Sequence, residues 1–308
     1  MNAGGVLVTG GAGFIGSHLA EALVERGYRV NVLDNLSMGK RENVPPQARF
    51  FHGDILDRPL VEQALEGTEA VFHLAARVAI RDSNNHFFED AQTNLMGTLH
   101  LLNRCGVRGI RKFILASSMA VYADRDGPTP IPETFTTEPL SPYGIAKLAA
   151  EKYTLLLSKL FGMEGICLRY FNVYGPRQTF TPYVGVITIF IRSLQKGVAP
   201  VIFGDGKQRR DFIHVEDVTR ANLLALESDL AGEILNVGTG RGTSVLEIAQ
   251  MLTGKLGPHL EPVYQIRHPG ELRNSIADVS KIRNLLGFQA RKELREKIDE
   301  IIEWNRAQ

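Results

Sequence analysis

The chain has few cysteines, and the two that it has stand far apart. Cys105 and Cys167 are the only cysteines among 308 residues, and neither belongs to a cluster with metal-ligand spacing. Isolated cysteines argue against a disulfide scaffold and against a cysteine-based metal site, and they suit a reducing compartment. The sequence therefore predicts a cytoplasmic protein with no metal ligands.

Long apolar runs and an excess of one charge are also lacking. No apolar run reaches ~18 residues, the length that a membrane-spanning helix needs. The formal net charge is only +1, so no strong field attracts nucleic acid or a membrane surface. The N-terminus enters a glycine loop after one short strand, which leaves no room for a signal peptide. We expect neither a nucleic-acid partner nor a membrane partner.

Apolar content is ample for a packed core. Hydrophobic residues make up 44% of the chain and charged residues 22%, as in ordinary globular proteins. A chain of 308 residues exceeds the usual single-domain size. This predicts either one large α/β domain with an annex or two domains.

A glycine-rich loop follows the first short apolar run. Gly10, Gly13 and Gly16 precede a segment with helical spacing at 17–26. Glycines in this setting let the backbone approach a pyrophosphate, whose charge then rests on the helix N-terminus. Asp34 follows about 20 residues later, where a carboxylate can hold the adenosine ribose and repel a 2′-phosphate. The loop therefore predicts NAD rather than NADP.

Strand-like and helix-like segments then alternate along the chain. Such alternation predicts a doubly wound, Rossmann-type parallel α/β sheet that binds ligands at the carboxyl ends of its strands. The expected strands are 6–8, 29–33, 49–53, 70–74, 112–117 and 165–169, and the expected helices are 58–65, 87–105 and the segment after 141. The candidate residues at strand ends are Asp34, Asp54, Ala75, Ala76, Ser117, Ser118 and Tyr170.

After Asn172, glycine and proline residues that are typical of loops become frequent. We expect residues 1–175 to form the NAD-binding domain, with 213–240 returning to it. Residues 176–308 would mainly form a smaller substrate-binding region. In these parts we expect helices over 186–194, 218–226 and 294–304, strands over 212–215 and 234–237, and a mixed segment after 241.

Tyr143 and Lys147 are four residues apart, so on a helix they share one face. Pro142 suits the first turn of such a helix. A lysine ammonium close to a phenol favours the phenolate, so we expect the pKa of Tyr143 to fall from about 10. The phenol could then act as a general base near neutral pH. The spacing alone is not specific, because Tyr and Lys occur this way on many surface helices.

Several motifs together resemble the extended short-chain dehydrogenase/reductases, in their nucleotide-sugar epimerase branch, and are most similar to UDP-galactose (UDP-glucose) 4-epimerases. The resemblance covers nearly the whole chain in unbroken order. The motifs are Thr9–Gly16, Asp34–Leu36, Gly53–Asp54, His73–Ala76, Ser117–Ser118, Val121–Tyr122, Ser141–Lys147, Leu168–Arg177, Arg210–Val215, Asn236–Gly238 and Ala277–Lys281.

The resemblance implies an NAD-dependent isomerase with a site assigned residue by residue. It implies catalysis by Ser118, Tyr143 and Lys147. The implied NAD-binding residues are Gly10, Gly13, Phe14, Ile15, Gly16, Asp34, Asn35, Asp54, Ile55, Leu74, Ala75, Ala76, Asn94, Ser117, Tyr143, Lys147 and Tyr170. The implied residues for a nucleotide-diphosphate sugar, most simply a UDP-sugar, are Ser118, Tyr143, Asn172, Val186, Arg210, Arg273 and Ser275.

The implied reaction is transient oxidation at sugar carbon 4, rotation of the 4-keto sugar and re-reduction. Met119 and Ala120 stand where dehydrating or decarboxylating relatives carry acids, which argues against those reactions. Uronate-epimerising relatives tend to carry threonine where this chain has Asn172, and an extra arginine near Thr179. The absence of both makes a carboxylated sugar a weaker expectation. Ser275 leaves space where a bulky aromatic would exclude an N-acetyl group. Open alternatives are a nucleotide-sugar oxidoreductase or dehydratase, a UDP-glucuronate 4-epimerase, and a non-enzymatic NAD-binding scaffold.

Two further expectations rest on the same resemblance. The family's arginine before Pro-Gly is replaced by His268, so Arg267, His268 and Arg273 all stay open as the diphosphate contact. The apolar residues on the helices that pair in relatives predict a homodimer, with burial in the chain's own core as the alternative. These residues are Leu95, Leu99, Leu102, Ala146, Ala150 and Tyr153.

Overall fold

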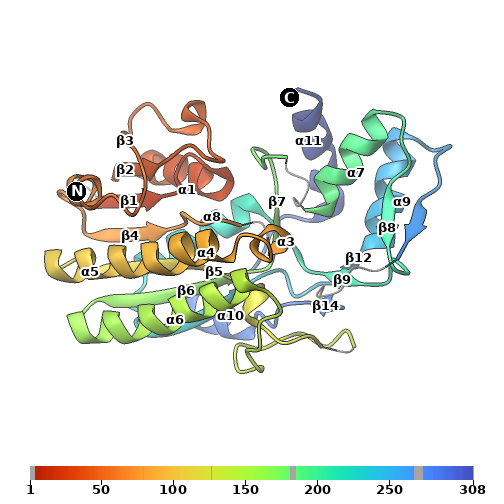
Figure 1. The fold of residues 1–308 in the computed structure, drawn as a ribbon. Helices are drawn as coiled ribbons and strands as arrows, with labels where there is room; N and C mark the ends of the chain where they lie inside the picture. The colour runs from red at the N-terminus through yellow and green to blue at the C-terminus, as the bar shows by residue number, and fades with distance from the viewer. Residues whose placement is uncertain (1–3, 79, 126, 181–184, 267–272, 308) are drawn as a thin grey trace.

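The computed structural model describes residues 4–78, 80–125, 127–180, 185–266 and 273–307. Its centre is a seven-stranded sheet in the order β11-β6-β5-β4-β1-β2-β3, with all neighbours parallel (Figure 1). This confirms the predicted doubly wound α/β fold. The strands are β1 (Gly5–Thr9), β2 (Arg29–Asp34), β3 (Arg49–His52), β4 (Ala70–His73), β5 (Lys112–Ser118), β6 (Glu164–Tyr170) and β11 (Glu233–Val237).

The strand order reverses between β1 and β4. From β1 the chain moves outward to β2 and β3, and then crosses to β4, β5 and β6 on the other side. The loops that follow β1 and β4 therefore meet: a Cβ added to Gly10 would lie 2.7 Å from the backbone nitrogen of Ala75. Such a switch point is where open α/β sheets bind their ligands.

Helices cover both faces of this sheet, because neighbouring residues of each buried strand point to opposite faces. Val6 and Val8 pack with one helical layer, whereas Leu7 packs with the other. The first layer holds α1 (Phe14–Glu25), α8 (Val215–Glu227) and α10 (Ser280–Leu286). The second holds α2 (Arg58–Ala64), α5 (Thr98–Arg108) and α6 (Pro142–Phe161), of which α5 and α6 run side by side in Figure 1.

A second core lies at one end of the molecule, where Figure 1 groups α7, α9 and α11. Apolar side chains of α7 (Val186–Gln195), α9 (Val245–Leu256) and α11 (Leu294–Arg306) meet there. Short strands connect this part to the main sheet. They are β7 (Asn172–Tyr174) with β10 (Phe212–His214), β8 (Val201–Phe203) with β13 (Val263–Gln265), and β9 (Arg209–Arg210) between β12 (Thr243–Ser244) and β14 (Asn274–Ser275).

One sequence-based expectation about helices was wrong. The single helix expected over 87–105 consists of α4 (Phe87–Ala91), a π-helical turn η2 (Gln92–Gly97) and α5. The segment after 241 mixes short strands with helices, as expected, and its helices before α11 are α9 and α10. The start of α9 has a local signal that we missed, a capping box between Ser244 and Glu247. No helix in the described ranges is long and apolar enough to cross a membrane.

Candidate active site

The glycine loop after β1 is packed so closely that Gly10 and Gly16 have no room for a side chain. Gly10 has φ +70°, and a Cβ at Gly16 would lie 2.2 Å from the carbonyl oxygen of Gly10. Helix α1 starts directly after the loop, with Gly13 as its N-cap and no side chain capping its first backbone N–H groups. Phe14 and Ile15 lie there half-buried. This end of α1 can therefore receive an anion such as a pyrophosphate.

Asp34 is held in a fixed orientation at the end of β2. Its Oδ2 accepts a hydrogen bond from Ala12 N (3.0 Å) and its Oδ1 one from Leu36 N (2.8 Å). The next residue, Asn35, donates from Nδ2 to Asp54 Oδ2 (2.9 Å) and so links the ends of β2 and β3. Each carboxylate oxygen has a second lone pair, which leaves Asp34 able to accept from ribose hydroxyls.

The loop Leu74–Ala76 after β4 lies across from the glycine loop and is supported by a buried chain of hydrogen bonds. Thr9 Oγ1 accepts from Ala75 N (3.3 Å) and bonds to His73 Nδ1 (2.7 Å). His73 Nε2 bonds to Thr98 Oγ1 (2.9 Å). Burial, with Lys147 adding to it, lowers the pKa of His73 to about 3, so this imidazole stays neutral.

Asn94 belongs to the support of the same loop. Its side chain is buried, accepts from Arg77 N and donates to Arg77 O, both at 2.9 Å, and donates to Asp90 Oδ1 at 2.9 Å. The π-helical turn η2 carries Asn94 into this position. Ile55 is buried against the end of the same turn, where a Cβ on Gly97 would lie 2.3 Å from its Cδ1. The side-chain amide of Asn94 is thus engaged by protein atoms.

Ser118 ends β5, and Tyr143 stands in the first turn of α6. These elements are far apart in the chain but touch closely: a Cβ on Gly144 would lie 2.3 Å from the carbonyl oxygen of Ala120. The Ser118 side chain lies close enough to the Tyr143 phenol to favour its ionised form. Ser83 Oγ also accepts from Tyr143 N (3.3 Å). The two hydroxyl groups predicted from the sequence are therefore brought together.

Lys147 lies one turn further along α6, on the same buried face as Tyr143. Its Nζ donates to Ala116 O (3.0 Å) and lies 5.9 Å from the centroid of the Tyr143 ring. Burial lowers the pKa of Lys147 to about 8, and the negative charges of Asp90 and Glu151 oppose this effect. The shared helix face that the spacing predicted is present.

The predicted fall in the phenol pKa is wrong for the protein residues alone. Burial raises the pKa of Tyr143 to about 12, and Asp90 adds to the rise, whereas the nearby Ser118 side chain opposes it. The ammonium of Lys147 is directed to a backbone carbonyl, so it does not offset the loss of water around the phenol. Activation of this phenol needs a further positive charge close to it.

A buried ion pair stands beneath the end of β5. Ser117 Oγ donates to Glu151 Oε1 (2.6 Å), and Arg169 makes two hydrogen bonds to the same carboxylate (2.8 and 2.7 Å). Tyr170 likewise turns inward, because its hydroxyl donates to Asn222 Oδ1 (2.9 Å). The side-chain hydroxyls of Ser117 and Tyr170, both predicted at the cofactor, are thus engaged within the protein.

Some of the predicted substrate residues lie together and others do not. Asn172 Nδ2 donates to Ser275 Oγ (3.3 Å), and Ser275 pairs with Arg210 between β14 and β9. The guanidinium of Arg273 makes two bonds to Asp205 (2.9 and 2.7 Å). Val186 lies half-buried at the start of α7. Arg267 and His268 lie outside the described residues.

Asp211 is a buried residue that the sequence analysis missed. Its carboxylate accepts from Thr239 N (2.8 Å), Thr239 Oγ1 (2.6 Å), Gly240 N (2.9 Å) and Ala277 N (3.2 Å). Its backbone N–H donates to Ser275 O (2.8 Å). Asp211 thereby fixes the segment that carries Ser275. The Arg-Asp-Phe-Ile-His motif contains Asp211, but its role depends on partners far along the chain.

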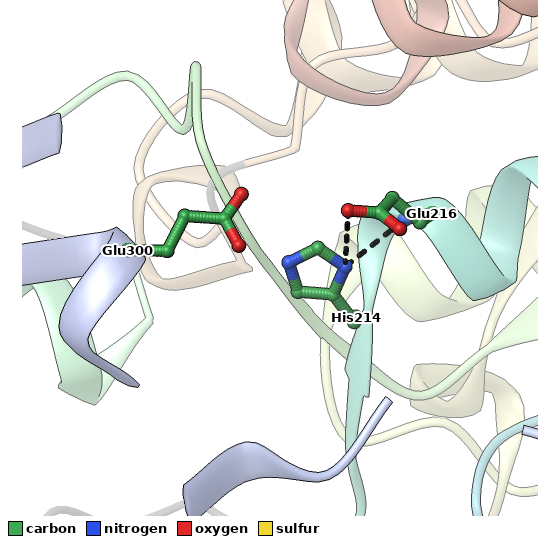
Figure 2. Close-up of side chains that lie close together, drawn as sticks. All are labelled: His214, Glu216 and Glu300. Atoms are coloured by element: carbon green, nitrogen blue, oxygen red, sulfur yellow. Dashed lines mark hydrogen bonds and ion pairs between the residues drawn. The ribbon is translucent and has the colours of Figure 1, made fainter. Parts of the chain in front are cut away.

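A second group of ionisable side chains, His214, Glu216 and Glu300, lies where α11 meets the start of α8 (Figure 2). His214 Nδ1 accepts from Glu216 N (3.3 Å). Lys297 Nζ lies 3.2 Å from Glu216 Oε1 and 2.6 Å from Glu300 Oε2. Lys292 Nζ lies 2.7 Å from Glu216 Oε2. The two ammonium groups thus balance the two carboxylates, and these contacts fasten α11 to α8.

Comparison with known proteins gives the same family along most of the chain. Residues 6–238 match the family model described as "NAD dependent epimerase/dehydratase family". A putative UDP-glucose 4-epimerase of Methanocaldococcus jannaschii is 40% identical over 300 residues, which cover 97% of this chain and 97% of that protein.

Solved structures agree in fold over the full length. The UDP-glucose 4-epimerase of Thermotoga maritima, crystallised with UDP-glucose, is 42% identical with a TM-score of 0.94, covering 98% of this chain and 99% of its own. The UDP-N-acetylglucosamine 4-epimerase of Methanobrevibacter ruminantium, in complex with UDP-N-acetylmuramic acid, is 34% identical with a TM-score of 0.93, covering 100% and 99%.

Proposed function

The chain belongs to the NAD-dependent epimerase/dehydratase family, and from that premise we propose that it is a UDP-hexose 4-epimerase acting on UDP-glucose and UDP-galactose. It is then an isomerase. The observation that carries the proposal is the proximity of Ser118 to Tyr143, with Lys147 on the same helix face as Tyr143, next to the switch point between β1 and β4.

These residues divide the proton chemistry at sugar carbon 4. The Tyr143 phenolate removes the proton of the 4-hydroxyl as the carbon gives up its hydride, and the phenol returns the proton when the hydride comes back on the other face. Ser118 hydrogen-bonds to the same oxygen and steadies the transfer. NAD, when bound, would accept and return the hydride, and its positive charge would lower the phenol pKa that burial has raised.

We assign the NAD site to the residues that surround the switch point between β1 and β4. The glycine loop and the uncapped start of α1 would hold the pyrophosphate. Asp34 would bind the adenosine ribose, and Asn35, Asp54 and Ile55 would lie on the adenine side. Lys147 would bind the nicotinamide ribose. The close approach of Gly10 to the Leu74–Ala76 loop supports this fit. Asn94, Ser117 and Tyr170 would form the walls of the site through their internal hydrogen bonds.

A second substrate class, the UDP-N-acetylhexosamines, is supported by Ser275. Its small side chain is fully buried and hydrogen-bonded from Asn172, so it does not project into the substrate side. The structural relative from Methanobrevibacter ruminantium is a UDP-N-acetylglucosamine 4-epimerase. Dehydration is less well supported, because Met119 and Ala120 follow Ser118 in the described turn η3 (Met119–Val121) and neither can exchange a proton.

The test is to incubate the purified protein, without added NAD, with UDP-galactose, UDP-N-acetylglucosamine and UDP-glucuronate, and to follow the products by NMR. We expect interconversion at carbon 4 for the first two. Loss of water, or use of external NADH, would favour the dehydratase or oxidoreductase alternative. No conversion of any of the three would count against the proposal.

We also propose a homodimer formed through α5 and α6. The face we expected has to be corrected, because Leu102, Ala146 and Ala150 belong to the core. The exposed apolar side chains on this side are Met96, Val107, Ile145, Tyr153, Leu156 and Leu160, each at least 42% exposed. A patch of this kind marks an interaction surface.

Light scattering on Leu156→Glu should show a monomer, whereas Leu285→Glu, at an exposed position on α10, should leave the dimer intact. A dimer that survives Leu156→Glu would contradict the proposed interface. The cytoplasmic location stays a prediction, supported by two buried cysteines that form no disulfide.

A further inference from the structure

A buried carboxylate, Asp90, lies on α4 next to the helix that carries Tyr143 and Lys147. Only 2% of Asp90 is exposed. Its Oδ1 accepts from Asn94 Nδ2, but its Oδ2 is buried with no hydrogen-bond partner among the described residues. A buried carboxylate oxygen without a partner costs free energy, so its presence calls for a physical reason.

The charges around Asp90 leave it opposite Lys147. Burial raises the pKa of Asp90, and the hydrogen bond from Asn94 opposes the rise. The charged groups that act on it are Lys147 from α6 and Arg77 from the loop after β4, which favour the carboxylate, and Asp82 from α3 (Ile80–Ser83), which disfavours it. Arg77 is already paired with Asp82 at 3.2 Å. Of the two positive charges near Asp90, that of Lys147 is therefore the one left to act on its carboxylate.

The positive charge of Lys147 is in turn balanced mainly by Asp90. The carboxylates that act on it are Asp90 and Glu151, with Asp90 the larger influence. Glu151 is already neutralised by its two hydrogen bonds with Arg169. His73, also near Lys147, is neutral. Asp90 is therefore the carboxylate whose charge is left to stabilise the Lys147 ammonium.

We propose that Asp90 is a positioning residue for the proposed epimerisation, whose carboxylate keeps Lys147 in its ammonium form and sets how readily Tyr143 releases its proton. The inference rests on the proposed function. A negative charge at this place favours the ammonium and disfavours the phenolate. It therefore moves the protonation equilibria of both groups to higher pH, and removing it moves both to lower pH.

The experiment is the pH profile of kcat for Asp90→Asn and for the wild-type protein, between pH 5.5 and 10. Both limbs of the profile should shift to lower pH by about 0.5 to 1 unit, a usual effect of one nearby charge. Activity at pH 9 should then fall several-fold relative to wild type, while activity at pH 6 is kept. Asp90→Glu, which retains the charge, should keep both limbs of the pH profile at their wild-type positions. Glu89→Gln, at an exposed position on the same helix, should leave them unchanged.

A structural role alone predicts a different result. If Asp90→Asn lowers kcat at every pH and leaves both limbs in place, Asp90 acts only through its bond to Asn94, and the proposal is overturned. Asp90→Ser, which makes room for water, serves as the second uncharged variant if Asp90→Asn does not fold.

A readout without turnover separates this proposal from the proposed function. The phenolate of Tyr143 absorbs near 295 nm and is isolated by subtracting the titration of Tyr143→Phe. In the protein as purified, its midpoint should be lower in Asp90→Asn than in wild type. An unchanged midpoint would refute the role of Asp90, whereas a shifted midpoint in a protein that converts no UDP-sugar would refute only the proposed function.

Discussion

Replacing Arg169 by methionine tests the buried ion pair beneath the catalytic strand. Arg169 and Glu151 are 2% and 0% exposed at their side chains, and two hydrogen bonds join them. Removing one partner leaves a buried charge without compensation, which typically costs about 3–5 kcal/mol. We expect Arg169→Met to lower the free energy of unfolding by this amount, and activity to fall because Ser117, next to Ser118, shares the same carboxylate.

Urea denaturation measures the free energy, and calorimetry gives an independent value. At about 2–4 °C per kcal/mol for chains of this order of size, the melting temperature should fall by roughly 6–20 °C. The double variant Glu151→Gln/Arg169→Met should recover a large part of the loss, because no buried charge is left and the glutamine can still accept from Ser117.

The matched control is Arg26→Met. Arg26 pairs with Glu227 where both side chains are nearly half exposed, so its removal should cost no more than about 1 kcal/mol. A loss below about 1 kcal/mol for Arg169→Met would refute the reasoning about burial. A double variant no more stable than the single one would show that the cost comes from packing and not from charge.

Three further predictions concern the cleft. Tyr143→Phe should lower kcat by at least about 100-fold, because the general acid–base is lost, while copurified NAD and the melting temperature stay unchanged. Gly16→Ala, whose Cβ would lie 2.2 Å from Gly10 O, should reduce copurified NAD more than tenfold; Gly254→Ala, with no atom within 4 Å, is the control. Since the pKa of Lys147 is about 8, the ammonium is lost as pH rises, so kcat should decline above pH 8; a flat profile to pH 10 would contradict this.

Features that depend on neighbouring residues could be predicted from the sequence. The alternation of strands and helices gave the parallel sheet, and glycine spacing gave the loop at the switch point, because both follow from local periodicity. The four-residue spacing of Tyr143 and Lys147 placed them on one helix face, since helix geometry alone decides that.

The electrostatics of the site could not be predicted in the same way. The phenol pKa depends on how deeply Tyr143 is buried, and Ser83, which bonds its backbone, is 60 residues away in the chain. Asp90 stands in the sequence Phe-Phe-Glu-Asp with nothing to distinguish it from its exposed neighbour Glu89. Its burial follows from the packing of α4 on α6, which no pattern within α4 reveals.

The substrate side was the hardest part to predict because its strands are too short to have a period. β9, β12 and β14 contain two residues each, so neither alternation nor propensity specifies them. The buried residue Asp211 fixes these strands instead. Its carboxylate accepts hydrogen bonds from Ala277 N and from the loop at Thr239, and its backbone N–H donates to Ser275 O. The position of Ser275, which we assign to the substrate side, is therefore set by one carboxylate and its distant partners.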